Sequence, residues 1–401
     1  MIRPGTFAMT LLLSALTGIG PLSVDMYLAS WPEIGRLLHA SPAQVQLTLS
    51  VFLVGFGIGQ VIYGPISDRH GRKPVLLAAV ALFVLASLVC AMATSIEVLI
   101  VARFFQAVGG SGMVVLPRAI ARDLHEGVFV ARELSRMAAV MALTPVVAPL
   151  IGAVLQTWFG WRSQFICLTG FGLVSAAMVW WLLPESLRVR APEPVSLMST
   201  LRAYGSFVRN RAFVAHLGIG TCAFLGLFAW ISGSSFVMQE IYGLSAFGFG
   251  VAFAIGSIGY LIGTFLGAHL VVRIGLDRTI GIGTLALAAG GLGIVLALAL
   301  GLTSAASLVL AVSLHLAGMG LVFPLTQAGA LLPFPQRAGA AASLVGFLQQ
   351  TSGAVMGIVI GHLLGQTAWP LAVAIATVGC LAVLLWVLSR GARARDSKTR
   401  S

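Results

Sequence analysis

Two ionisable side chains, Asp25 and Arg103, stand alone inside long apolar stretches of the chain. Charged groups are costly in hydrocarbon, so each is a candidate functional group. Burial disfavours the charged form of a carboxyl, and a nearby cation favours it. Movement of Arg103 relative to Asp25, or the arrival of a cationic compound, would therefore load or release one proton. Two static alternatives remain, a fixed ion pair or an Arg103 bound to backbone carbonyls.

The two groups are expected at matching depth, whether or not they touch. At 1.5 Å per helical residue, Asp25 would lie about 8 to 10 Å below a helix end near Ser30 or Trp31. Arg103 would lie about 9 to 10 Å below the start of its own helix, near Ile96 or Glu97.

A second cluster of charge is the stretch "GPISDRHGRKPV", which covers 64–75 and is predicted to be a loop. A Gly permits close helix approach and another permits a tight turn. The acid and the three basic residues could pin helix ends in one conformation and release them in another. The alternative is a solvated basic turn. The residues assigned to gating are Gly64, Asp68, Arg69, Gly71, Arg72 and Lys73.

The composition places these groups in a membrane. Of 401 residues, 58% are hydrophobic and only 9% are charged, whereas soluble domains carry about a quarter charged residues. Alternation typical of a β-barrel is missing, and the first apolar stretch lacks a cleavage site, so we expect it to be a retained span. The sequence therefore predicts an all-α membrane protein.

Apolar windows of about 20 residues predict twelve spans. They cover 7–30, 44–66, 75–94, 97–118, 134–158, 162–183, 211–237, 246–272, 279–300, 304–332, 339–364 and 369–389. The longest polar interruption divides them into six and six. The predicted parts are an N-terminal bundle 1–183, a linker 184–210, a C-terminal bundle 211–389 and a basic tail 390–401.

The basic residues predict the orientation, because positively charged loops stay in the cytoplasm. With the N-terminus inside, all but three of the 24 Lys and Arg fall on cytoplasmic loops, cytoplasmic helix ends or the tail. Both termini are then cytoplasmic. The net charge of +12 fits anionic lipid headgroups as partners rather than nucleic acid.

The two halves of the chain also resemble each other weakly. "IGQVIYGPISDRHGRKPVLL" after the second span has a degraded counterpart in "IGTFLGAHLVVRIGLDRTIG" after the eighth. Duplicated six-helix halves are a transporter architecture, with the site between them near the middle of the membrane.

Several strings resemble one family. "GPISDRHGRKPV", "RFFQAVGGSGMVVLPRAIARD" and "TPVVAPLIGA" are similar to signature strings of the major facilitator superfamily. "PLSVDMYLASWP" and "FAWISGSSFVMQEIYG" resemble its bicyclomycin- and chloramphenicol-resistance (Bcr/CflA) branch, with Ala29 replacing the usual Pro. The resemblance implies two pseudo-symmetric six-helix bundles, proton-driven drug export, and a hinge and seal at Pro149 and Gly152.

Other side chains are candidates for the substrate site. Polar residues inside spans could line a cavity or only bond between helices, and aromatic residues could form its wall or face lipid. The predicted substrate-binding residues are Asp25, Tyr27, Gln46, Arg103, Gln106, Trp230 and Phe236.

Other function classes lack their motifs. There is no metalloprotease or nucleophile-elbow motif, no P-loop and no repeated channel filter, so we expect neither an enzyme nor an ATP-driven pump. The expected activity is efflux of amphipathic compounds such as phenicols by a monomer in the bacterial inner membrane. It would need no cofactor beyond the proton gradient. A narrow metabolite exporter and a proton symporter remain alternatives.

Overall fold

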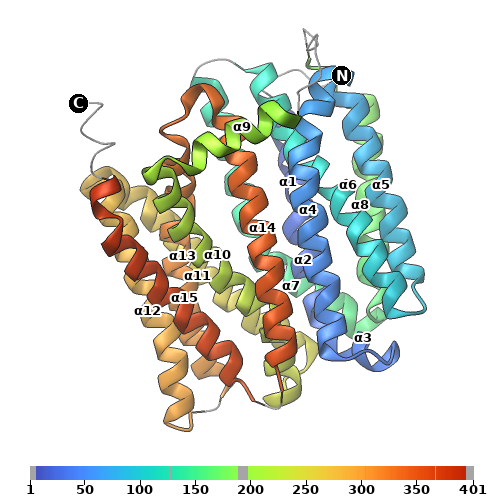
Figure 1. Ribbon diagram of the computed structural model, residues 1–401. Helices are drawn as coiled ribbons and strands as arrows, with labels where there is room; N and C mark the ends of the chain where they lie inside the picture. The colour runs from blue at the N-terminus through green and yellow to red at the C-terminus, as the bar shows by residue number, and fades with distance from the viewer. Residues whose placement is uncertain (1–5, 126–127, 188–196, 303, 366, 394–401) are drawn as a thin grey trace. The chain divides into compact units, whose positions relative to one another are not determined.

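The computed structural model describes residues 6–125, 128–187, 197–302, 304–365 and 367–393 (Figure 1). All regular elements in these ranges are helices. Twelve of the described helices are long and apolar enough to cross a membrane. The chain is therefore a multi-pass all-α membrane protein, which confirms the predicted fold class.

The chain forms two compact units, Met1–Val195 and Ser196–Ser401. The boundary lies inside the predicted linker 184–210, of which 188–196 is outside the described residues. The predicted domain limits otherwise stay predictions, and residues 394–401 of the predicted tail are also outside the described part.

The first unit contains six spans, the first of which is divided among four short elements. Its elements are α1 (Phe7–Thr17), α2 (Ile19–Asp25), η1 (Leu28–Ser30), α3 (Trp31–Leu37), α4 (Pro42–His70), α5 (Arg72–Met92), α6 (Ile96–Leu124), α7 (Val128–Phe159) and α8 (Arg162–Leu182).

The second unit begins with a short helix and continues with six spans. Its elements are α9 (Leu197–Val208), α10 (Arg211–Phe236), the π-helical turn η2 (Val237–Ile241), α11 (Ala246–Ile274), α12 (Leu276–Ala299), α13 (Ala305–Leu331), η3 (Pro335–Arg337), α14 (Ala338–Leu363) and α15 (Trp369–Leu388).

The same packing order recurs within each unit. In the first, α6 packs on α4 and α5, and α5 packs on α8; in the second, α13 packs on α11 and α12, and α12 packs on α15. Glycines permit the close pairs in both. A Cβ at Gly109 would lie 2.5 Å from the Phe83 nitrogen, and one at Gly290 would lie 2.4 Å from the His315 nitrogen. Small residues at such crossings let backbones approach.

The first span is longer than predicted and is not a uniform helix. It runs from Phe7 to Leu37. The helical span continues beyond Ser30 because Pro32 lies in the first turn of α3, where proline is well tolerated. The α-helix tightens into the 3₁₀ turn η1 just after Asp25. The acid thus lies near the middle of the span, and Glu33, expected outside it, lies within it.

The predicted loop at 64–75 is also different. Helix α4 continues through His70, α5 begins at Arg72, and only Gly71 between them is non-helical, with φ of 100°. Gly64 therefore does not end a helix. A Cβ there would meet no atom of its own unit within 4 Å, so no helix of that unit approaches closely at this residue, and its gating role stays a prediction.

Candidate functional site

The carboxyl of Asp25 is buried beside an irregular part of the first span. Its residue is 4% exposed and is the last of α2. On the neighbouring α7, a Cβ at Gly152 would lie 2.1 Å from the Met26 carbonyl oxygen. The predicted Pro149–Gly152 stretch, helical within α7, therefore packs directly behind the acid.

The guanidinium of Arg103 on α6 is fully buried. Its Nη1 donates to the Ser23 carbonyl oxygen at 3.0 Å and to Gln106 Oε1 at 2.7 Å. Its carbon lies 4.2 Å from the ring centre of Phe52 and 4.7 Å from that of Tyr27. Aromatic faces attract a cation, so these rings stand in for a counter-ion.

Asp25 is not the partner of Arg103. None of the ion pairs found among the described residues joins them. The reason is the helical repeat: Ser23 and Tyr27 are four residues apart and share a face, whereas a residue two positions from Ser23 points away. Arg103 thus sits at the depth of Asp25, as predicted, but on another side of the span.

Two donors of Arg103 are left over. Its Nε and Nη2 are buried and make no hydrogen bond to the described residues. An unpaired buried donor is costly, and a bound acceptor would relieve that cost. Among the described residues, the cluster therefore offers a carboxyl that makes no ion pair and a guanidinium with two donors that bond no acceptor.

Two further predicted polar residues of this unit, Tyr27 and Gln106, belong to the cluster. Tyr27 Oη lies 3.0 Å from Thr48 Oγ1, and Gln106 Nε2 donates to Ser87 Oγ at 2.8 Å. Gln46 is buried on α4. Phe52 and Ser87 also belong to the cluster and are not among the predicted site residues, because spans contain many aromatic rings and hydroxyls and the sequence does not distinguish these two.

The two predicted aromatic residues belong to the second unit. Trp230 and Phe236 are buried on α10, and the Trp230 ring stacks on Phe253 at 5.8 Å between centres. Within its unit, Trp230 is a packed core residue. Their assignment to a substrate site stays a prediction.

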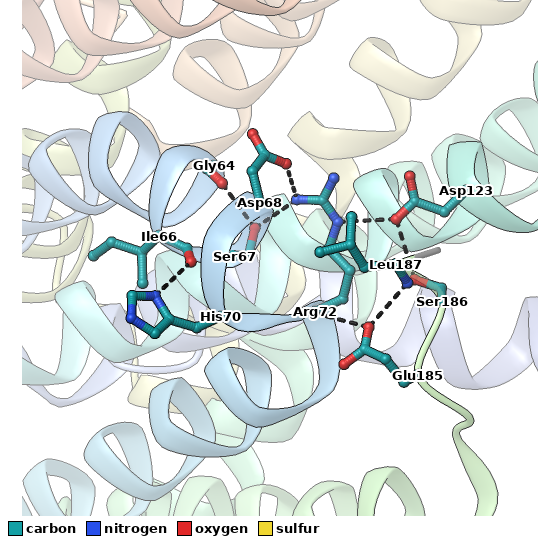
Figure 2. A network of polar contacts seen from close by, with 10 residues as sticks. All are labelled: Gly64, Ile66, Ser67, Asp68, His70, Arg72, Asp123, Glu185, Ser186 and Leu187. Carbon is teal, nitrogen blue, oxygen red and sulfur yellow. Dashed lines mark hydrogen bonds and ion pairs between the residues drawn. The ribbon is translucent and has the colours of Figure 1, made fainter. Parts of the chain in front are cut away.

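Two of the predicted gating residues, Asp68 and Arg72, belong to an ion-pair network around Arg72 (Figure 2). Its Nη1 lies 2.5 Å from Asp68 Oδ1 and donates to Ser67 Oγ at 2.6 Å, while its Nε lies 2.9 Å from Asp123 Oδ2. The Arg72 side chain is 10% exposed. The network thus joins the end of α4, the start of α5 and the end of α6.

A carboxylate from beyond α8 completes this corner, as Figure 2 shows. Glu185 accepts from the backbone N–H groups of Arg72 at 3.0 Å and Lys73 at 3.2 Å, where the helix dipole favours an anion. A Cβ at Gly71 would lie 2.6 Å from Glu185 Oε2. Glycine is therefore needed here for space as well as for its positive φ.

The two remaining basic residues of this stretch differ in their contacts. Lys73 Nζ donates to the Trp180 carbonyl oxygen at 2.8 Å, whereas Arg69 is exposed and takes no part in the network drawn in Figure 2. Asp123 and Glu185 were not assigned to this site. The sequence shows that both acids lie at the ends of spans, the fourth and the sixth, but acids are common at span ends and do not by themselves indicate a gating site.

Comparison with known proteins identifies relatives of the whole chain. The family described as Major Facilitator Superfamily matches residues 13–358 and again 235–401. The chain is 34% identical over 358 residues to an uncharacterized MFS-type transporter of Bacillus subtilis, covering 88% of each. It is 30% identical to the bicyclomycin resistance protein homolog of Haemophilus influenzae, covering 99% of each. It is also 30% identical to the multidrug resistance protein MdtL of Salmonella typhimurium, over 93% of this chain and 92% of that one.

Solved structures share the fold at much lower identity. A POT family transporter in complex with 5-aminolevulinic acid has a TM-score of 0.76 at 13% identity, covering 98% of this chain and 99% of that one. The xylose transporter XylE of E. coli in a partially occluded inward-open conformation has a TM-score of 0.74 at 14% identity, covering 94% and 96%.

Proposed function

The chain belongs to the Major Facilitator Superfamily, and from that premise we propose that it exports small amphipathic compounds in exchange for protons. It is a transporter with small-molecule substrates, not an enzyme. Export, rather than uptake, is supported by the relatives named for resistance to bicyclomycin and to multiple drugs. Antibiotics, with phenicols among them, are the proposed substrates.

The buried, unpaired carboxyl of Asp25 carries the proposal. Burial disfavours a lone carboxylate, so a proton or a cationic or strongly polar substrate group is needed to occupy the site. Because Arg103 is held by rings and a backbone carbonyl, it does not neutralise Asp25 permanently. Proton and substrate then compete for one acid, and the inward proton gradient drives the substrate out.

The Arg72 network is the proposed gating element. The Asp68 side chain is 41% exposed, and an ion pair to so exposed a carboxylate is weak enough to break and re-form. The network would hold the ends of α4, α5 and α6 in one conformation and release them in another.

The proposed setting is the bacterial cytoplasmic membrane, with the protein acting as a monomer. Both termini would face the cytoplasm, since this orientation leaves nearly all basic loops inside. The coupling needs only the proton gradient and no bound cofactor.

The test is transport into inside-out membrane vesicles. First, a susceptibility panel in an efflux-deficient host selects a compound. That compound should then accumulate in energised vesicles and partly dissipate the proton gradient. Asp25→Asn should abolish both effects, and Glu97→Gln, which removes an exposed acid at the start of α6, should leave both intact.

Two results would contradict the proposal. Substrate leaving the vesicles along with protons would indicate a symporter. Full gradient-driven accumulation by Asp25→Asn would show that this carboxyl carries no coupling proton.

A further inference from the structure

The second unit contains a charged cluster to which the proposed function assigns no role. It joins the start of α12 to the segment that follows α15, two helices that pack together (Figure 1). Arg393 Nε lies 2.7 Å from Asp277 Oδ1. Arg393 Nη2 donates to the Trp386 carbonyl oxygen at 2.7 Å, and Nη1 donates to Ser389 Oγ.

The Trp386 side chain closes the cluster from the other side. Its Nε1 donates to the Asp277 carbonyl oxygen at 3.2 Å. A Cβ at Gly281 would lie 2.3 Å from the Trp386 ring, so the ring rests directly on α12. We call Asp277, Trp386, Ser389 and Arg393 the α12–α15 clasp.

The charges of the clasp match the dipoles of the helix ends that they touch. Asp277 lies in the first turn of α12, where a negative charge is favourable, and Arg393 binds the Trp386 carbonyl near the end of α15, where a positive charge is favourable. The Arg393 side chain is 3% exposed and the Asp277 side chain is 46% exposed, so the guanidinium is buried while the carboxylate stays in contact with solvent.

In the first unit, charged side chains also bind a helix start and a helix end, but the acid and the base come from the opposite helices. There the acid comes from beyond the last helix, because Glu185 binds the first N–H groups of α5. The base comes from the start of α5, because Lys73 binds the Trp180 carbonyl near the end of α8. In both units a carboxylate lies at the start of one helix and a cation lies at the end of another, where each interacts favourably with the helix dipole.

We propose that Arg393 is a positioning residue for transport, which holds the start of α12 against the end of α15 while the second unit moves. The α11–α12 junction is a single residue, Gly275, with φ of 84°. Helix α12 packs on α13 and α15, and the clasp adds a constraint at its first turn, next to this glycine. This role rests on the proposed function only in that the chain must cycle between conformations.

The test compares Arg393→Ala with Arg390→Ala, which removes the same charge from an exposed residue of the same segment. Arg393→Ala should lower turnover roughly threefold to tenfold with little change in KM, and Arg390→Ala should not. Arg393→Lys should fall between, because an ammonium cannot reproduce the guanidinium fork.

Two further measurements separate the clasp from a general loss of stability and from the export proposal. Asp277→Ala with Arg393→Ala should lower turnover no further than Arg393→Ala alone, since the two residues act as a pair. Amide hydrogen exchange at the first turn of α12 should speed up in Arg393→Ala and not in Arg390→Ala, and this readout requires no substrate.

Equal turnover for the two single variants, or unchanged exchange in Arg393→Ala, would overturn the proposed role of the clasp. A wild-type protein that exports nothing would overturn only the proposed export.

Discussion

At the scale of single residues, the defining feature is a buried cation that does not use the buried acid. Arg103 is surrounded by the rings of Tyr27 and Phe52 and bonds the Ser23 carbonyl. An aromatic cage with one carbonyl is a weaker partner than a carboxylate, and it leaves Asp25 free to bind a proton. The exchange chemistry proposed for this protein depends on that separation.

Arg103→Lys should lower the efflux rate about tenfold or more, because a lysine ammonium is compact and strongly hydrated and cannot reproduce the planar guanidinium that lies against the Phe52 and Tyr27 rings. Efflux from cells or into inside-out vesicles, normalised to the amount of protein, measures the effect. Arg162→Lys is the matched control. Arg162 also bonds a carbonyl, that of Ala93, and lies 4.2 Å from the ring centre of Trp161, but it lies at the start of α8. Equal losses in the two variants would mean that Arg103 has only a packing role.

The two charged residues could be predicted from sequence, and their contacts could not. Isolated charges in apolar windows are conspicuous whatever the fold. Whether Arg103 meets Asp25 or Ser23 depends on the rotation of one helix by two residues, and no composition signal sets that rotation. Asp123 and Glu185 were missed for a similar reason, since acids at span ends are common and only the fold brings these two to Arg72.

At the scale of elements, the first span and α7 form a tight pair at the level of the acid. Gly152 approaches the backbone of Met26 so closely that no side chain fits between them. The 3₁₀ turn η1 follows directly, so the position of Asp25 depends on this contact. A sequence pattern of Pro and Gly predicts a kink, but only the packing shows what the kink supports.

Gly152→Ala should therefore destabilise the protein by about 1 to 3 kcal/mol, the usual cost of overpacking, and impair transport. Gly170→Ala on α8 is the control, because a Cβ there would meet nothing within 4 Å and alanine favours a helix by up to about 1 kcal/mol. Thermal unfolding in detergent compares the two. A Gly152→Ala protein as stable as Gly170→Ala would show that the two helices are not in close contact.

The junction between α4 and α5 is the second such element. Its charged string was predicted as a loop because charge and glycine are typical of turns, yet helical hydrogen bonds continue on both sides of Gly71. The basic residues consequently point in different directions. Arg72 is inside the network, and Arg69 is exposed.

Arg72→Ala should slow turnover about tenfold while substrate affinity stays within about twofold, since the change affects interconversion of conformations and not the binding site. Arg69→Ala, its neighbour of equal charge, should transport normally. Substrate binding and transport are measured on the same preparations. A loss of affinity in Arg72→Ala with normal turnover would contradict the gating role.

At the scale of the whole molecule, each unit repeats one packing order among four of its six spans. In each unit, polar contacts also join the start of the third span to the end of the sixth. The spans and their number follow from hydropathy alone, and eleven of the twelve predicted spans agree with the described helices to within a few residues at most ends. The exception at the first span arises because Glu33 and Arg36 broke the apolar window while the helix went on. Charge pairing between helix ends is invisible to hydropathy, since its acid and base come from distant parts of the chain.

The competition between proton and substrate is a property of the whole transporter, and direct proton release tests it. Purified protein in weakly buffered detergent solution is mixed with a substrate identified in the susceptibility panel, and the pH is recorded. Linkage predicts release of up to about one proton per bound substrate from the wild type and from Glu97→Gln, and none from Asp25→Asn. Release from Asp25→Asn equal to that of the wild type would contradict the account.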